Sequence, residues 1–284
     1  MKNDRPSETA AYVAMGRATA HARARLRGFS DPFAMQLLPD NLREVTERRL
    51  RGGWPRSLRE FVVMAIAEVM ERLVGPRTVM IDRALDKLPP AMQVVIVGAG
   101  LDARPYRLPG ISECIVFELD HPATQALKRS RVDHVRPVAR ELRYVAVDLT
   151  RESLGDALNR AGHSTNAPTA WVFEGVISYL TTDQVDAAVG AMAARSASGS
   201  RLLLTYNEPN WVGRVLGNHV SAWRNEPART VFSREEMRQL LARHGFRVCA
   251  DADGLQRVAE LGVTPSLIDR TFVRFHHVVF AERA

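Results

Sequence analysis

The 284-residue sequence is poor in cysteine and in lysine. Its two cysteines, Cys114 and Cys249, lie far apart and outside any Cys-x-x-Cys spacing, so neither a disulfide scaffold nor a cysteine metal site is expected. Both lie in or beside apolar runs, which predicts that each is a buried free thiol. Only three of the 39 basic residues are lysines, namely Lys2, Lys87 and Lys128.

Long hydrophobic runs are also missing. No apolar stretch approaches the length needed to span a membrane, and the N-terminus begins with polar residues and lacks the apolar core of a signal peptide. We therefore expect a cytoplasmic protein without a membrane partner.

The formal charge of +7 raises the question of a polyanionic partner. The arginines, however, are scattered through every segment of the chain, a pattern typical of the codon usage of a GC-rich genome. We expect no nucleic-acid partner. A polyanion site at Arg23, Arg25 and Arg27 remains the open alternative.

The first part of the chain, up to residue 88, has apolar residues at helical spacing. Short polar side chains precede the helical runs at Ser7, Asp31-Pro32 and Ser57, and they predict three helix starts. With 46% hydrophobic and 25% charged residues, the chain has the composition of a globular protein. We expect residues 1–88 to form a helical cap on a larger domain of residues 89–284.

From residue 93 onward, short β-branched runs alternate with helical stretches, as in a parallel sheet whose strands are covered on both faces. The predicted strands lie at residues 94–97, 115–117, 144–147, 171–173, 202–204, 246–250 and 276–280, and the predicted helices at 122–131, 151–161, 183–194 and 233–244. The fold class is therefore α/β, a Rossmann-like, seven-stranded, mostly parallel sheet with helices on both faces.

The first strand runs into the turn Gly98-Ala99-Gly100, where two glycines let the backbone approach a ligand closely. A tight strand-to-helix turn without a ligand is the alternative. The third glycine of the dinucleotide fingerprint is replaced by Ala103, which weakens a pyrophosphate-binding interpretation.

Four acidic residues lie at the ends of the second, third and fourth strands of the predicted sheet. Of Glu118 and Asp120 at the second strand, Asp120 is favoured for binding ribose hydroxyls because it lies at the carboxyl end. Asp148 follows the third strand and Glu174 the fourth, so both are expected at the same crevice, although either could instead cap the following helix.

The glycine turn, the segment Phe117 to Pro122, the pair Asp148-Leu149 and the segment Phe173 to Thr181 together resemble the leucine carboxyl methyltransferase family. The order and spacing match over residues 77–181. The resemblance implies a class I methyltransferase that uses S-adenosylmethionine. It also implies the cofactor-binding residues: Gly98 and Gly100 at the methionine part, Asp120 at the ribose, Asp148 and Leu149 at the adenine, Glu174 near the amino acid end, Arg77 paired with the cofactor carboxylate, and Arg17 nearby.

The acceptor side of the site is less specific. Tyr179 and Tyr206 are the catalytic candidates, and residues 207–232, with Trp211, Trp223 and Phe232, are expected to form an apolar lid insertion. The resemblance favours O-methylation of a carboxylate or hydroxyl of a small, polyketide-like molecule by a monomer or homodimer. A nicotinamide-dependent oxidoreductase and a non-catalytic S-adenosylmethionine-binding protein remain the alternatives. No metal is expected.

Overall fold

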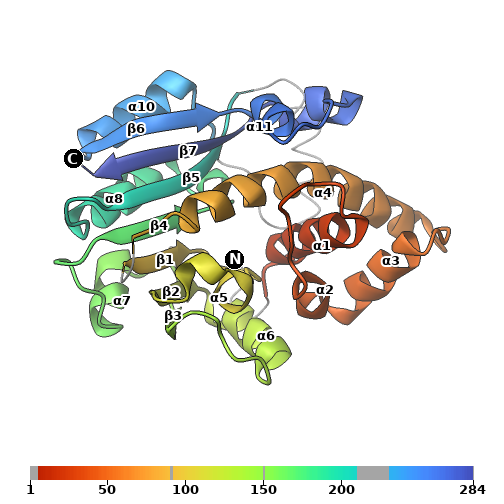
Figure 1. Cartoon of the computed structure of the whole chain (residues 1–284), viewed down its shortest axis with the longest axis horizontal. Coiled ribbons are helices and arrows are strands. Elements are labelled where there is room, and N and C mark those ends of the chain that lie inside the picture. Colours follow the sequence, from red (N-terminus) through yellow and green to blue (C-terminus); the bar gives the residue numbers. More distant parts are fainter. Residues whose placement is uncertain (1–5, 90–91, 150, 210–229, 284) are drawn as a thin grey trace.

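The computed structural model describes residues 6–89, 92–149, 151–209 and 230–283. Its centre is a seven-stranded sheet with the strand order β3-β2-β1-β4-β5-β7-β6, in which only the pairings of β7 are antiparallel (Figure 1). The strands are β1 (Gln93–Val97), β2 (Ile115–Asp120), β3 (Glu141–Ala146), β4 (Thr169–Phe173), β5 (Arg201–Asn207), β6 (Phe246–Ala252) and β7 (His276–Arg283). The predicted fold class is confirmed.

The sheet is covered on both faces because its central strands are apolar on both sides. Val95 and Val97 of β1 pack in a core with the helices α7 (Leu154–Arg160) and α8 (Thr182–Ala194), whereas Val94 and Ile96 pack against the helix α4 (Leu58–Leu85). The helices that follow the strands are α5 (Arg104–Arg107), α6 (Pro122–Val132), α7 (Leu154–Arg160), α8 (Thr182–Ala194), α10 (Arg234–Arg243) and α11 (Gly254–Glu260). Three short turns, η1 (Pro109–Ile111), η2 (Ile177–Tyr179) and the π-helical η3 (Asp269–Val273), complete the described elements.

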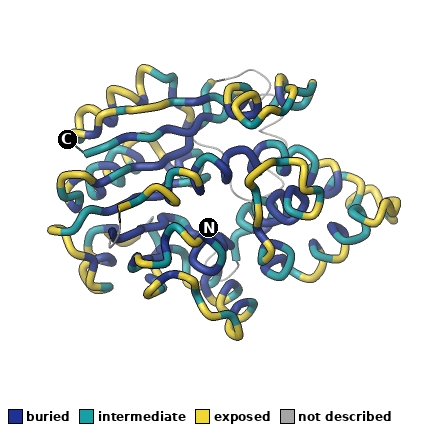
Figure 2. The backbone as a smooth tube through the Cα atoms, in the orientation of Figure 1, coloured by how far each residue is buried: buried dark blue, intermediate teal, exposed yellow. Residues whose placement is uncertain are grey.

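The edge strands differ from the central ones. β3 begins three residues before the predicted run, and of its residues only Val145 is buried, because β3 has a neighbouring strand on one side alone. Cys249 is exposed, so the prediction of a second buried thiol is wrong. It lies on the edge strand β6, at an irregularity of the register between Val248 and Ala250, where the strand no longer keeps its alternation. Figure 2 shows the burial concentrated in the middle of the sheet.

The N-terminal part consists of the helices α1 (Glu8–Arg23), α2 (Ala34–Leu37), α3 (Asp40–Leu50) and α4 (Leu58–Leu85). Ser7 and Ser57 cap α1 and α4 through their hydroxyl oxygens, as predicted. The predicted helix start at Asp31 is wrong. The carboxylate of Asp31 is buried and pairs with Arg17 instead, and α2 begins only at residue 34.

The helix α4 links the two parts of the chain. Its first half packs with α1 to α3 through Val63 and Met64, and its second half packs on the sheet through Ile81 and Leu85. The division at residue 88 therefore stays a prediction. The expected lid at residues 207–232 lies mostly outside the described residues, which omit 210–229, together with Trp211 and Trp223. Across the described part of the chain, no helix combines the length and apolarity that a membrane crossing requires.

Candidate functional site

A pocket of about 250 Å³ opens at the carboxyl ends of the parallel strands. Segments from α1, α4, the glycine turn and the loops after β2, β3 and β4 line it. The structure brings together eight of the nine residues predicted for the site, namely Arg77, Gly98, Gly100, Asp120, Asp148, Leu149, Glu174 and Tyr179. Arg17 and His121 lie in the same lining.

The glycine turn forms part of the pocket wall with its backbone. Gly98 and Gly100 have φ angles of +67° and +52°, a region that side chains strongly disfavour. A Cβ atom on Gly98 would lie 2.4 Å from Cγ2 of Val176, and one on Gly100 would lie 3.0 Å from Cβ of Ala10. Both conformation and crowding therefore require glycine here.

Asp120 joins the end of β2 to the glycine turn. One carboxylate oxygen accepts a hydrogen bond from the backbone N–H of Gly100, and the other accepts one from that of His121 at 2.6 Å. Because a carboxylate offers about four lone-pair positions, it can still accept hydrogen bonds from two hydroxyl groups in the pocket. Burial raises the pKa of Asp120. These features fit a ligand that carries ribose hydroxyls.

Glu118, the other acid of β2, lies away from the pocket. Nζ of Lys128 donates to its two carboxylate oxygens at 2.6 and 2.7 Å, and both side chains are fully buried. The preference for Asp120 over Glu118 thus agrees with the geometry.

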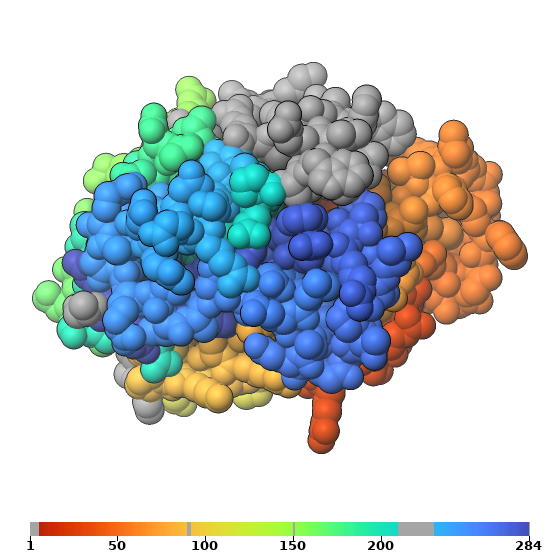
Figure 3. Space-filling view, turned by 90° about the horizontal axis from the view of Figure 1, so that it is seen from above, coloured from red at the N-terminus to blue at the C-terminus, as the bar shows by residue number. Residues whose placement is uncertain are grey.

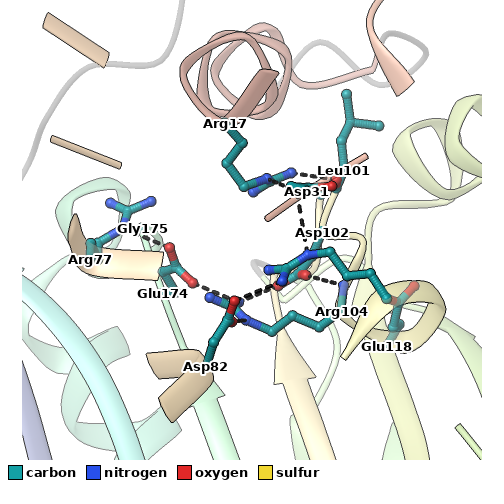
Figure 4. Close-up of polar contacts among 12 residues, drawn as sticks. Arg17, Asp31, Arg77, Asp82, Leu101, Asp102, Arg104, Glu118, Glu174 and Gly175 are labelled. Atoms are coloured by element: carbon teal, nitrogen blue, oxygen red, sulfur yellow. Dashed lines mark hydrogen bonds and ion pairs between the residues drawn. The ribbon is translucent and has the colours of Figure 1, made fainter. Parts of the chain in front are cut away.

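A buried network of ion pairs supports the other side of the pocket (Figure 4). The guanidinium group of Arg104 donates to Asp82 at 2.7 Å, to Asp102 at 2.5 Å and to Glu174 at 2.8 Å. Nε of Arg77 donates to the second oxygen of Glu174 at 2.6 Å. One arginine therefore connects α4, the segment after the glycine turn and the end of β4.

The charges of this network keep Glu174 and Asp102 ionised. Burial opposes ionisation of Glu174, but Arg104 and Arg77 outweigh it and lower its pKa to about 2. Arg104 likewise holds the pKa of Asp102 below its usual range, despite burial. Because Nε of Arg77 donates to Glu174, the two terminal nitrogens of Arg77 remain for other partners. They lie near Gly175, about 4 Å from where a Cβ atom added to that glycine would be. They are placed to meet an anionic group in the pocket.

The two tyrosine candidates lie in different places. Tyr179 lines the pocket, and its hydroxyl donates to Oγ1 of Thr9 in α1 at 3.4 Å. Tyr206 does not line it, because its side chain stacks on His277 with the ring centroids 4.7 Å apart and its hydroxyl donates to Asp251. Burial and the negative charge of Asp251 raise the pKa of Tyr206 above its usual value.

Sequence reasoning missed several residues of the site. Asp82, Asp102 and Arg104 of the ion network received no role, although Asp102 and Arg104 belong to the motif after the glycine turn. Ser7, Thr9 and Ala10 of the α1 segment also line the pocket. Within the part of the chain that the structure describes, no cluster of three or more His, Cys, Asp or Glu side chains is arranged to hold a metal ion.

Comparisons with known proteins match the same region. The sequence profile of the leucine carboxyl methyltransferase family matches residues 10–193. A protein of Streptomyces coelicolor assigned as an S-adenosyl-L-methionine-dependent methyltransferase is 40% identical over 47% of this chain and 49% of its own length. A protein of Mycobacterium sp. (strain JLS) with the same assignment is 36% identical over 70% of this chain and 65% of its own length. The match thus spans less than two thirds of either relative.

The fold has a counterpart among solved structures. The crystal structure of a DUF574 family protein from Streptomyces avermitilis superimposes with a TM-score of 0.61, covering 98% of both chains at 14% identity. At that identity the likeness concerns the fold alone. Because the family profile covers more than half of the sequence and the pocket residues fall within or next to it, the chain belongs to the leucine carboxyl methyltransferase family.

Proposed function

We propose that this chain is an S-adenosylmethionine-dependent methyltransferase that methylates an oxygen, a carboxylate or a hydroxyl, of a small molecule. The observation that carries the proposal is Asp120, which is fixed by the glycine turn at the end of β2 and still has capacity for hydroxyl donors in the pocket. Family membership and the assignments of both relatives support S-adenosylmethionine-dependent methyl transfer, the coarser part of this proposal.

The proposed roles follow the order of the strands. Asp120 binds the ribose, and Asp148 and Leu149, beyond β3, surround the adenine. Gly98 and Gly100 approach the methionine part on the other side of Asp120. At the far end, the terminal nitrogens of Arg77 bind the carboxylate, and Glu174 holds Arg77 in place through Nε.

The chain contributes mainly by positioning and by excluding water. The bound cofactor supplies a methyl group that the sulfonium charge already activates. The residues of the pocket therefore need to hold the acceptor oxygen in line and to keep the site dry. The α1 segment, with Thr9 and Ala10, covers the pocket, which supports the proposed role of residues 1–88 as a cap. Tyr179 is the proposed residue of the acceptor side.

Calorimetric titration with S-adenosylmethionine and S-adenosylhomocysteine tests the cofactor site. We expect the wild type to bind both ligands. Asp120→Ala should weaken binding by about tenfold to a hundredfold, since each hydrogen bond to a charged group contributes roughly 1.5–3 kcal/mol. The control is Asp133→Asn, which removes an exposed carboxylate outside the pocket lining. No binding of either ligand to the wild type would overturn the proposal, and binding of a nicotinamide dinucleotide instead would favour an oxidoreductase.

The chemistry of the acceptor can be tested separately. Incubation with S-adenosylmethionine that carries a tritiated methyl group, against a panel of small carboxylic acids, phenols and amines, should label an acid or a phenol. Mild base releases labelled methanol from a methyl ester but not from an aryl ether. Label on nitrogen or carbon acceptors alone would contradict O-methylation while leaving the cofactor site intact.

A further inference from the structure

A fully buried arginine lies outside both the pocket lining and the ion network. Arg257 belongs to α11, and its side chain has no exposed surface. None of its three guanidinium nitrogens has a hydrogen-bond partner among the described residues. A cation that loses its hydration in the interior costs several kcal/mol unless a partner compensates for it. Such a cation needs a partner that the described residues do not supply, and a ligand can supply it.

The two acidic groups whose charges act on Arg257 are already paired with other residues. The charges that act on Arg257 belong to Arg77, Asp253 and Glu174. Asp253 caps the start of α11 and pairs with Arg234 at 3.2 Å, while Glu174 is held by Arg77 and by the ion network. The two acids are therefore already engaged, and the Arg77 charge adds to the positive potential at Arg257.

The location of Arg257 connects it to the pocket. Arg77 and Glu174 line the pocket, and α11 packs against α4, the helix that carries Arg77. His276, whose pKa is lowered by burial and by the charges of Arg257 and Arg77, starts β7 next to the end of β5. In Figure 3 the C-terminal segment, in blue, lies beside the N-terminal helices, in orange. Helix α11 lies between β6 and β7 in the chain, and both strands are on the opposite side of β4 from β2, the strand of Asp120.

We propose that Arg257 binds an oxyanion of the methyl acceptor, so that the enzyme selects acceptors with an ionised acidic group. This inference rests on the proposed function, which places the cofactor between Asp120 and the Arg77–Glu174 pair, and it assigns the α11 side of that pair to the acceptor. The planar guanidinium group presents paired donors that match the two oxygens of a carboxylate. The anion supplies the hydrogen bonds that the fold does not.

The first test separates a binding role from a structural one. Arg257→Met keeps an apolar stem and removes the unpaired charge, so the melting temperature of the ligand-free protein should stay the same or rise. The matched control is Arg195→Met. Arg195 is also buried, but it donates to Asn159 at 2.7 Å and to the carbonyl of His163 at 3.0 Å, so its loss should lower the melting temperature. A lower melting temperature for Arg257→Met would show that Arg257 serves the fold and would overturn the inference.

The second test measures anion binding directly. The protein saturated with S-adenosylhomocysteine is titrated with acetate and with benzoate at constant ionic strength, with chloride as the balancing anion, by calorimetry and thermal unfolding. We expect binding to the wild type, binding that is weaker by about tenfold or more in Arg257→Met, and partial retention in Arg257→Lys. Arg195→Met should bind the anions as the wild type does.

The outcomes distinguish this inference from the proposed function. If S-adenosylhomocysteine binds but the wild type takes up neither acetate nor benzoate, or Arg257→Met takes them up equally well, the inference is wrong and the cofactor site stands. If Arg257→Met instead loses S-adenosylmethionine and S-adenosylhomocysteine, Arg257 binds the cofactor carboxylate and the assignment to the acceptor is wrong. If neither cofactor binds to the wild type, the proposed function itself fails.

Discussion

Arg104 and Arg257 are equally buried, yet their surroundings are opposite. Arg104 is 1% exposed and donates to three carboxylates, whereas Arg257 is 0% exposed and none of its nitrogens has a partner among the described residues. Three negative charges outweigh burial and raise the pKa of Arg104 above its usual range. Burial and the Arg77 charge lower the pKa of Arg257 to about 9. The fold supplies charged hydrogen-bond partners to Arg104, but the described residues supply none to Arg257.

The difference in pairing distinguishes a charge that stabilises the fold, Arg104, from a charge that is proposed to bind a ligand, Arg257. The Arg104 network joins α4 to the glycine turn and to the end of β4, so the backbone elements around the pocket are fixed before any ligand arrives. Such preorganisation is what a positioning enzyme needs. Arg257 contributes no such contact, and its cost to stability is consistent with function being favoured over stability at a binding site.

The largest effect should come from breaking the Arg104 network. Arg104→Met leaves Asp82, Asp102 and Glu174 buried without their common partner, and we expect a loss of about 3–5 kcal/mol in the free energy of unfolding. Urea denaturation monitored by circular dichroism measures this loss. Arg257→Met, measured in parallel, should lose nothing. A loss below about 1 kcal/mol for Arg104→Met would remove the contrast between the two arginines.

An intermediate effect should appear in the dependence of stability on pH. The pKa of His276 is lowered to about 3 by burial, Arg257 and Arg77, from 6.5 in the unfolded chain. Below pH 6.5 the unfolded chain therefore binds a proton that the folded chain does not, and stability falls as the pH is lowered. Glu174, with a pKa of about 2 against 4.5 unfolded, adds a second loss only below pH 4.5.

Arg257→Met should change the first of these two pH windows more than the second, because Arg257 is the main charge acting on His276, whereas Arg104 and Arg77 are the main charges acting on Glu174. Without the Arg257 charge, the folded pKa of His276 rises, and the loss of stability between pH 6.5 and 4.5 should shrink by about 1 kcal/mol. Urea denaturation at half-unit pH steps, with NMR titration of the His276 ring, measures both quantities. An unchanged His276 pKa in the variant would mean that the two groups do not interact.

The sequence predicted the fold well because its signals are local. The apolar runs of β1 and β4 are covered on both faces. Asp120 is the last residue of β2 and Glu174 directly follows β4, so both lie at the pocket. Turn chemistry likewise identified Gly98 and Gly100, whose positive φ angles only glycine tolerates well.

The errors and omissions come from pairings between distant residues. Asp31 looks like a helix cap in its local sequence, but its partner is Arg17 in another helix. Arg104 reaches Asp82, 22 residues before it, and Glu174, 70 residues after it, and no local pattern encodes those contacts. Tyr206 follows the predicted strand at residues 202–204, but it belongs to β5, and the antiparallel pairing of β5 with β7 places it on His277. Long-range geometry, and not residue type, decides these cases.

The smallest effect should come from an exposed ion pair, which tests whether burial is the variable that matters. Arg243 pairs with Asp186 at 2.8 Å, but the two side chains are 63% and 41% exposed. Water screens this attraction and the flexible side chains lose entropy when they pair, so Arg243→Ala should cost less than about 0.5 kcal/mol in the same urea experiment. A cost above about 1 kcal/mol would mean that the distance between charges alone governs their contribution. If an exposed ion pair stabilised the fold that much, burial would add little to the free energy that an ion pair contributes. The contrast between Arg104 and Arg257 would then need a cause other than desolvation.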